Sequence, residues 1–285
     1  MINFFRSTTL RIALALLAPI FAGAASAQTR EQVIRIPTVG GVSMLATVMR
    51  PPGEQRRPLA IINHGSPASA GQRPEMDLPR YEPLSSWFVE RGYVVVLPLR
   101  RGYGDTGGKW VESYGDCDEP DYYTAGLHGA EDIQATLDVM RKQRYALPDR
   151  SIVIGHSAGG WATLALSSRN PPGVAGMINF AGGRGGRQQL GDGRIGNCKA
   201  GELVKAAGRY GETAHVPVLW IYAANDTFFS PNLARRMFDA YNKAGGHGTY
   251  RPLGAFDGNG HTFVGDEDGV EFWEKPVSRF LDSLK

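Results

Sequence analysis

The chain has 285 residues, of which 42% are hydrophobic and 21% charged, enough apolar material to bury a core. Glycine and proline number 37 and 18, a loop-rich composition below the range of low-complexity chains, so collagen, coiled coil and wholesale disorder are excluded. The formal net charge is +3, and it falls to +1 once Arg6 and Arg11 near the amino terminus are set aside. Without a basic excess, the chain has no electrostatic attraction for nucleic acid.

The first 27 residues have the layout of a secretory signal peptide. Two arginines precede the apolar run Ile12–Ala22, and Ala25-Ser26-Ala27 supplies small residues before a cleavable bond. A membrane anchor is the alternative, but residues 12–27 contain a proline and a glycine and fall short of the ~20 apolar residues of a spanning helix. We expect cleavage after Ala27 and a mature domain over residues 28–285 that is secreted or periplasmic, with no membrane association.

Strand-like and helix-like segments alternate along the rest of the chain. Gln32–Ile36 and Val42–Met49 flank a Gly40-Gly41 turn and predict an opening hairpin. Further strands are predicted over Pro58–Asn63, Tyr93–Leu99, Ser151–Gly155, Val174–Phe180, Val218–Ala223 and Gly248–Leu253. Helices are predicted over Tyr81–Arg91, Ala125–Lys142, Ala158–Ser168, Pro231–Ala244 and Gly269–Leu284.

The predicted strands are continuously apolar, which indicates a sheet covered on both faces. Their alternation with helices favours parallel strands joined by right-handed crossovers. We therefore predict one α/β domain with a doubly wound, mostly parallel sheet of about eight strands. The glycine- and arginine-rich segment Gly182–Ala214 departs from this pattern, and we interpret it as a short insertion between two strands, in place of a large cap.

Cys117 and Cys198 are the only cysteines, too few and too widely spaced for a zinc site. In an oxidising compartment an even pair predicts a disulfide, with two free buried thiols as the alternative. The bridge would close a span of 81 residues. The loss of chain entropy in the unfolded state would then stabilise the fold by about 4.5 kcal/mol.

A serine stands in a tight turn between a predicted strand and a predicted helix. The run Gly155-His156-Ser157-Ala158-Gly159 is a G-x-S-x-G turn in the strand–turn–helix context that such a nucleophile requires. Small flanking residues relieve the crowding of the turn, and the helix N-terminus directs free N–H groups at developing negative charge. We predict Ser157 as a nucleophile; a glycine-rich turn with a serine cap is the alternative.

A nucleophilic serine needs a base, and the base needs an orienting acid. Of six histidines, His261 alone follows the last predicted strand, in a glycine-rich loop at the sheet edge where catalytic groups gather. Asp226 directly follows the strand Val218–Ala223 and is the predicted acid. Asp257 and Asp266, which share the loop of the histidine, are its rivals.

The order serine, aspartate, histidine on alternating strands and helices resembles the α/β-hydrolase fold. Within that fold the chain is similar to the dienelactone-hydrolase and prolyl-oligopeptidase-like branch. The similarity lies in Asn63-His64-Gly65-Ser66-Pro67 and in the run RGYGDTGG over residues 101–108, where Thr106 replaces the usual serine. The resemblance spans nearly the whole mature chain, and it implies ancestry more than a reaction, because dienelactone hydrolase itself uses a cysteine.

The resemblance also implies an oxyanion hole. One N–H comes from Ala158, the residue after the nucleophile, and the other from the loop after the third strand. Pro67 has no N–H, so Gly65 or Ser66 supplies it, and we choose Ser66. Aromatic residues in the neighbouring loops predict a substrate pocket, with the core as the alternative for several of them: Tyr103, Trp110, Tyr114, Trp161, Phe228 and Phe229.

We predict a secreted serine esterase that forms an acyl-enzyme on Ser157, uses no metal or cofactor, and has a small-molecule ester as its partner. A peptidase or amidase of the same fold and a non-catalytic ligand-binding relative are the alternatives. The Cys117–Cys198 bridge would fix the mouth of the pocket. Arg184, Arg187 and Arg194 in the insertion are interpreted as solvated charges, with recognition of an acidic acyl group as the alternative. The oligomeric state is not predicted.

Overall fold

The structure is a computed structural model that describes residues 1–2, 28–67, 69–191 and 193–285. Residues 3–27, which make up most of the predicted export signal, lie outside the described residues. Within the ranges given, no helix is long and apolar enough to cross a bilayer.

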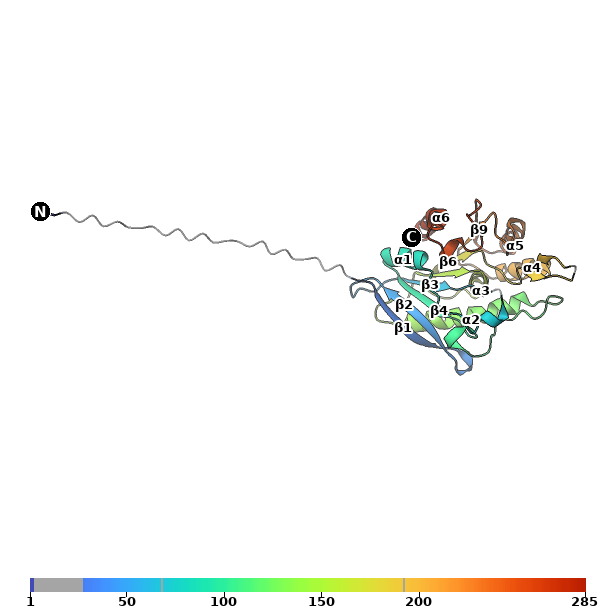
Figure 1. Ribbon diagram of the computed structural model, residues 1–285, viewed down its shortest axis with the longest axis horizontal. Helices are drawn as coiled ribbons and strands as arrows, with labels where there is room; N and C mark the ends of the chain where they lie inside the picture. Colours follow the sequence, from blue (N-terminus) through green and yellow to red (C-terminus); the bar gives the residue numbers. More distant parts are fainter. Residues whose placement is uncertain (3–27, 68, 192) are drawn as a thin grey trace.

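An eight-stranded sheet runs through the centre of the molecule (Figure 1). Its strands are β1 (Arg30–Pro37), β2 (Ser43–Arg50), β3 (Leu59–Asn63), β4 (Val94–Leu99), β5 (Ser151–His156), β6 (Val174–Phe180), β9 (Val218–Ala223) and β10 (Gly248–Leu253). They are ordered β1-β2-β4-β3-β5-β6-β9-β10. β1 and β2 form the predicted hairpin, β2 is antiparallel to β4, and the other neighbours are parallel.

Helices cover both faces of this sheet, with α1 and α6 on one side and α2 on the other in Figure 1. They are α1 (Glu82–Glu90), α2 (Tyr122–Met140), α3 (Ala158–Ser167), α4 (Ala200–Gly211), α5 (Pro231–Lys243) and α6 (Val270–Ser283). One hydrophobic core joins α2, α3, α4 and α5 to the sheet, and a second joins α1 and α6 to the opposite face.

Strand residues alternate between the two cores. Trp220 of β9 packs in the first core, and its neighbours Leu219 and Ile221 pack in the second. Because both faces of the sheet are covered, apolar residues are needed at every position, which explains the continuous apolar runs. The predicted doubly wound, mostly parallel sheet is confirmed.

The insertion over residues 182–214 contains more regular structure than its composition suggests. β7 (Gln188–Gln189) pairs antiparallel with β8 (Ile195–Gly196), and α4 follows. The apolar side chains that α4 buries are spaced three and four residues apart, on one helical face: Leu203, Ala206, Ala207 and Tyr210. This periodicity predicts a helix, but the glycines within and beside it obscure the signal.

The predicted disulfide between Cys117 and Cys198 is present. It joins the loop that precedes α2 to the loop that precedes α4. Cys198 is also held by its backbone, because its N–H donates to the carbonyl of Gly185 at 3.1 Å and its carbonyl accepts from the Tyr122 hydroxyl at 2.7 Å. The bridge therefore fixes the insertion against the start of α2.

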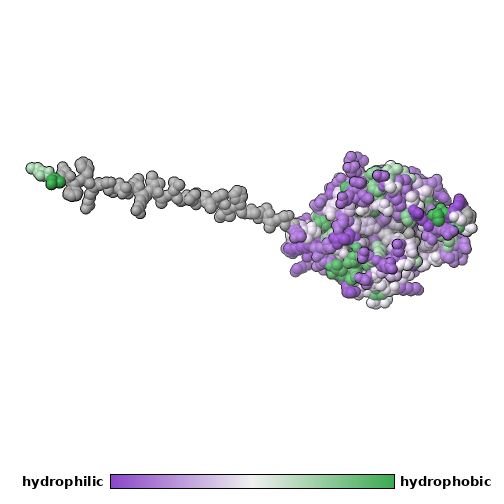
Figure 2. Space-filling model, in the orientation of Figure 1, coloured by the Kyte–Doolittle hydropathy of each residue, from purple (hydrophilic) through white to green (hydrophobic). Residues whose placement is uncertain are grey.

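The surface of the folded part is mostly polar on the face shown in Figure 2, with small hydrophobic patches between polar side chains. After residue 28, the large exposed hydrophobic side chains are Val33, Val39 and Ile195. Scattered apolar side chains of this kind are ordinary on protein surfaces. The clefts of the molecule, rather than an exposed apolar patch, are therefore the candidate positions for a functional site.

Candidate active site

Ser157 occupies the sharp turn between β5 and α3. Its backbone has φ 53° and ψ −118°, a conformation that non-glycine residues rarely adopt and that stores strain. The backbones on either side approach so closely that a Cβ on Gly155 would overlap the carbonyl of Gly159, and one on Gly159 would overlap that of Asn63. Glycine at both positions therefore permits the turn, which places Ser157 at the N-terminus of α3.

The structure brings Ser157, His261 and Asp226 together. His261 Nε2 is 3.0 Å from Ser157 Oγ, and its Nδ1 is 3.0 and 3.1 Å from the two carboxylate oxygens of Asp226. Asp226 also accepts the N–H groups of Phe228 and Phe229 at 2.7 and 2.9 Å. Because an ionised carboxylate only accepts, Nδ1 of His261 carries the proton and Nε2 is free to accept one from the serine.

The three side chains are largely shielded from solvent, with exposed fractions of 9% for Ser157, 6% for Asp226 and 4% for His261. The ring of Phe228 stacks on the imidazole of His261, with centroids 4.2 Å apart and planes 24° apart. This contact limits rotation of the imidazole. The rival acid Asp257 is exposed in the same loop, as is Asp266 farther along.

A chain of hydrogen bonds connects the loop after β3 to the loop that carries His261. The Gly65 N–H donates to the Tyr81 hydroxyl at 3.2 Å, which lies 2.9 Å from His156 Nδ1, and His156 Nε2 lies 2.7 Å from the carbonyl of His261. Since a carbonyl only accepts, His156 must donate from Nε2 and accept the Tyr81 proton at Nδ1. Burial lowers the pKa of His156 to about 3 and raises the pKa of Tyr81, so both stay neutral at pH 7.

The sequence predicts Tyr81 only as the start of a helix and gives no sign of its place in the site. The residue caps α1 with φ 46°, in the left-handed region. No local pattern predicts that its hydroxyl reaches His156, which lies 75 residues later in the chain.

The predicted oxyanion donors border the same cleft as Ser157. Ala158 is the first residue of α3, so its N–H has no acceptor within the helix. Gly65 already donates its N–H to Tyr81. Of the two candidates in that loop, Gly65 is therefore the one whose N–H already has an acceptor, which favours the prediction of Ser66.

The cleft beside Ser157 has a volume of about 290 Å³. Its walls come from the loop after β3, the segment before α2, the turn of Ser157, the start of the insertion and the loop after β9. Of the aromatic residues predicted for the pocket, those that line it are Trp110, Tyr114, Phe228 and Phe229. A larger cavity, of about 520 Å³, opens at the opposite end of the sheet, next to Pro58 and Tyr93, and none of the candidate site residues lines it.

Two predicted pocket residues do not line the cleft, and those predictions are wrong. Trp161 is fully buried, because its face of α3 turns toward α2, where its indole N–H donates to the carbonyl of Tyr122 at 2.8 Å. Tyr103 is also fully buried. It lies behind the cleft wall, donating to Glu112 and accepting from the Trp110 indole, each at 3.1 Å.

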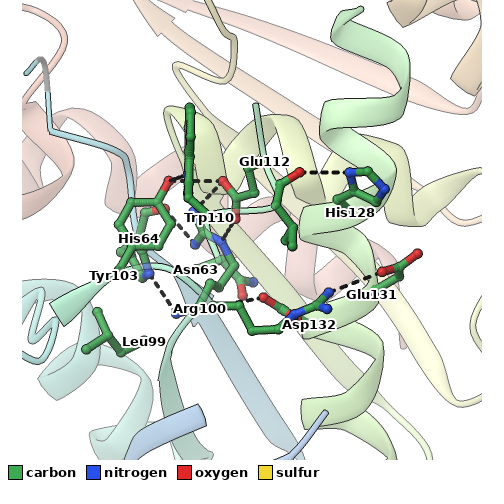
Figure 3. A network of polar contacts seen from close by, with 12 residues as sticks. Asn63, His64, Leu99, Arg100, Tyr103, Trp110, Glu112, His128, Glu131 and Asp132 are labelled. Carbon is green, nitrogen blue, oxygen red and sulfur yellow. Dashed lines mark hydrogen bonds and ion pairs between the residues drawn. The ribbon is translucent and has the colours of Figure 1, made fainter. Parts of the chain in front are cut away.

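Glu112 is the centre of a buried ionic network (Figure 3). Its carboxylate contacts Arg100, Arg184 and the Tyr103 hydroxyl. Arg100 and Glu112 are fully buried, and Arg184 is 5% exposed. His64 belongs to this network, since the Arg100 N–H donates to its Nε2 at 3.1 Å and Arg100 Nη1 donates to its carbonyl at 2.8 Å. Burial lowers the pKa of His64 well below its ordinary value, so it is neutral.

The RGYGDTGG run, residues 101–108, forms the loop after β4 and has a structural role next to this network. Arg101 binds Asp132 of α2 through its backbone N–H, at 2.9 Å, and through its guanidinium. The hydroxyl of Thr106 donates to the carbonyl of Leu99 at 2.7 Å and accepts the N–H of Leu45 at 2.9 Å. The run therefore fastens the loop after β4 to α2 and β2.

Known proteins resemble this chain in sequence and in fold. Residues 79–177 match the prolyl oligopeptidase family, a stretch that includes Ser157 and ends before Asp226 and His261. The dipeptidyl-peptidase 5 of Porphyromonas gingivalis is 28% identical over 152 residues, and the monoacylglycerol lipase of Mycolicibacterium smegmatis is 29% identical over 140. A solved esterase from Pyrococcus furiosus has a TM-score of 0.63 at 15% identity, covering 90% of this chain and 93% of its own. The chain has the fold of the α/β-hydrolases.

The chain covers only part of the two relatives found by sequence. The matched segments are 51% and 49% of this chain, but 20% of the peptidase and 42% of the lipase. The matches agree with the predicted dienelactone-hydrolase and prolyl-oligopeptidase-like branch, and the proteins that resemble the chain carry peptidase, lipase and esterase names. The fold is therefore shared, whereas the reaction must be argued from the cleft.

Proposed function

We propose that this protein is a serine hydrolase that cleaves a carboxylic ester through an acyl-enzyme on Ser157. The observation that carries the proposal is the continuous set of contacts from Ser157 Oγ through His261 to Asp226. A serine hydroxyl is a weak nucleophile until a positioned base removes its proton, and the carboxylate keeps that base in the productive tautomer.

In the proposed mechanism, Ser157 Oγ attacks the acyl carbonyl while its proton passes to His261 Nε2. The oxyanion of the tetrahedral intermediate accepts hydrogen bonds from the N–H groups of Ala158 and Ser66. Collapse of the intermediate breaks the ester bond, and the imidazolium gives its proton to the departing alcohol. Water then attacks the acyl-enzyme by the same route and releases the carboxylic acid.

A peptidase or amidase is the second candidate, favoured by the prolyl oligopeptidase match and by the dipeptidyl-peptidase relative. A peptidase that binds a free amino terminus needs an acidic group near the nucleophile to pair with it. The residues that line the described cleft include Arg73 and Arg184 and no aspartate or glutamate. This charge pattern supports the ester as substrate.

Hydrolysis of p-nitrophenyl acetate and of an aminoacyl p-nitroanilide tests the proposal. We expect the native protein to turn over the ester, and Ser157→Ala to lose at least about a thousandfold in kcat. Full activity of Ser157→Ala would refute the nucleophile. Faster hydrolysis of the anilide than of the ester by the native protein would favour the peptidase instead.

We also propose that the protein acts outside the cytoplasm, in the periplasm or the medium. The Cys117–Cys198 disulfide supports this location, because such bridges persist in oxidising compartments. The signal-peptide pattern of the first 27 residues is the second support. The test is to express the full chain in a bacterial host, fractionate the cells and sequence the amino terminus. Gln28 as the first residue of an exported product is expected, and an uncleaved cytoplasmic product would contradict the proposal.

A further inference from the structure

Arg184 lines the cleft beside Ser157, yet only 5% of it is exposed. The N–H of the preceding residue, Gly183, donates to the carbonyl of Ser157 at 3.1 Å. The backbone that carries Arg184 is therefore fastened to the nucleophile's own turn. This contradicts the interpretation of Arg184 as a solvated charge of the insertion.

Positive charge is in excess at this wall of the cleft. Glu112 is shared by Arg184 and Arg100, so two buried guanidinium groups face one buried carboxylate. Asp132, the next carboxylate beyond Arg100, is engaged by Arg101 through two hydrogen bonds. Because an uncompensated buried charge is unfavourable, an anion bound at Arg184 would be stabilising.

Arg184 also has an unused donor. Its Nε is buried and has no hydrogen-bond partner among the described residues, and a buried donor without an acceptor is costly. Arg73 adds a second cation to the same cleft, where its guanidinium lies 3.7 Å from the centre of the Trp110 ring. Among the residues that the structure describes, none of those lining this cleft is acidic.

We propose that Arg184 binds an ionised carboxylate on the substrate, so that the preferred substrate is an ester that carries a second, free carboxyl group. This inference rests on the proposed function, because it adds a recognition group to the ester cleaved at Ser157. A neutral acceptor would satisfy only the free N–H, whereas a carboxylate also balances the charge and forms the stronger, charge-assisted bond. The cleft volume of about 290 Å³ restricts the substrate to a small one.

The buried charge has one competing role, which is to stabilise the oxyanion that forms at Ser157. In that case loss of Arg184 would slow the hydrolysis of every ester alike. Recognition of a carboxylate instead changes the ratio between charged and neutral substrates. The ratio of kcat/KM values is therefore the readout.

The carboxylate can sit on either side of the ester bond, and the two arms of the experiment separate these cases. The acyl arm compares the monoethyl esters of succinic, glutaric and adipic acid with the ethyl esters of the corresponding monoamides. The alcohol arm compares 4-acetoxybutanoate with 4-acetoxybutanamide. Each pair differs only in the charge of one terminal group, and product formation is followed by chromatography.

We expect the native protein to prefer the charged member of at least one pair by about tenfold or more in kcat/KM, mainly through a lower KM. Arg184→Gln should bring that ratio to about one while neutral esters are still hydrolysed. This variant leaves Glu112 paired one-to-one with Arg100, so its fold should be retained. Arg184→Lys keeps the charge and part of the preference, and Arg236→Gln, on the exposed face of α5, is the control for net charge.

Inhibition of the native protein provides the same test without a variant. Glutaramate, the monoamide that keeps one carboxylate, should inhibit hydrolysis of a neutral ester with a Ki at least about tenfold lower than that of glutaramide, the neutral diamide. Ratios near one for every pair, or an equal loss on charged and neutral esters in Arg184→Gln, would overturn the inference and leave the serine hydrolase in place. If the native protein hydrolysed neither these esters nor p-nitrophenyl acetate, the proposed function would fail as well.

Discussion

The hydroxyl of Tyr81 donates to Nδ1 of His156 over 2.9 Å and thereby connects two loops of the active site. Gly65, beside the proposed oxyanion donor Ser66, donates to the same hydroxyl, and His156 donates in turn to the carbonyl of His261. All three hydrogen bonds have a fixed direction. They hold the oxyanion loop and the loop of the base in register, which makes Tyr81 and His156 positioning residues.

Replacing Tyr81 by phenylalanine removes two of these hydrogen bonds and keeps the ring. Each is worth about 1 kcal/mol net, so we expect kcat to fall by about tenfold to thirtyfold while KM changes less than about twofold. Tyr93→Phe is the matched control, since it removes the hydroxyl of a tyrosine at the opposite end of the sheet. Both kcat and KM of the two variants are measured by steady-state kinetics with p-nitrophenyl acetate. An unchanged kcat in Tyr81→Phe would show that the hydroxyl does not position the site.

Glu112 should be far less tolerant of substitution than Arg184. Glu112→Gln leaves Arg100 and Arg184 buried without a counter-ion, and breaking a buried ion pair in this way costs about 3–5 kcal/mol. Arg184→Gln leaves a one-to-one pair and should cost much less. Urea unfolding of both variants gives the two free energies. Similar losses in the two variants would mean that the charge excess assigned to this network is wrong.

The disulfide should contribute strongly to stability. It closes a loop of 81 residues. A disulfide across a loop of this size stabilises the folded state by about 4.5 kcal/mol when strain is small. We expect the double variant Cys117→Ala/Cys198→Ala to lose about 2–5 kcal/mol in free energy of unfolding. Reduction of the native protein should reproduce the loss and leave the double variant unchanged. A double variant as stable as the native protein would contradict this prediction.

The neutral state of His156 predicts a dependence of stability on pH. Its pKa is about 3 in the folded protein, against 6.5 for the free side chain. Between these two values the unfolded chain binds a proton that the folded chain does not, so the free energy of unfolding rises with pH across this window. When the pH is lowered from 7 to about 4.5, His156 alone should therefore lower the free energy of unfolding by roughly 2 kcal/mol.

The His156→Gln variant isolates this contribution. At pH 7 it lacks the hydrogen bonds of the imidazole and should be less stable than the native protein, and the gap should narrow by roughly 2 kcal/mol at about pH 4.5. His215→Gln, at an exposed site, controls for the loss of an imidazole as such. A gap that stays constant or widens on acidification would contradict the neutral assignment of His156.

The sheet could be predicted from the sequence because its signals are local. Apolar runs such as Val218–Ala223 end at the residues that precede the site, and the parallel arrangement brings those ends to one edge. The same logic placed Ser157, Asp226 and His261 together, since each follows a strand directly or lies in the loop after one.

The remaining features depend on contacts that no local pattern contains. Arg184 lies in a loop whose composition is typical of a solvated segment, and its burial follows from Glu112, which lies 72 residues earlier in the chain. Trp161 follows the nucleophile by four residues, but the rotation of α3 turns its ring toward α2. Tyr81 is defined by its contact with His156, and only the folded chain brings those two side chains together.

Labelling with a fluorophosphonate tests most directly whether Ser157 is a nucleophile activated by His261. We expect the native protein to gain one covalent adduct, located on Ser157 by peptide mass spectrometry, and Ser157→Ala to gain none. His261→Ala should react at least about a thousandfold more slowly, because the serine then has no base. An unlabelled native protein, an adduct on another residue, or equal labelling of His261→Ala would contradict the account.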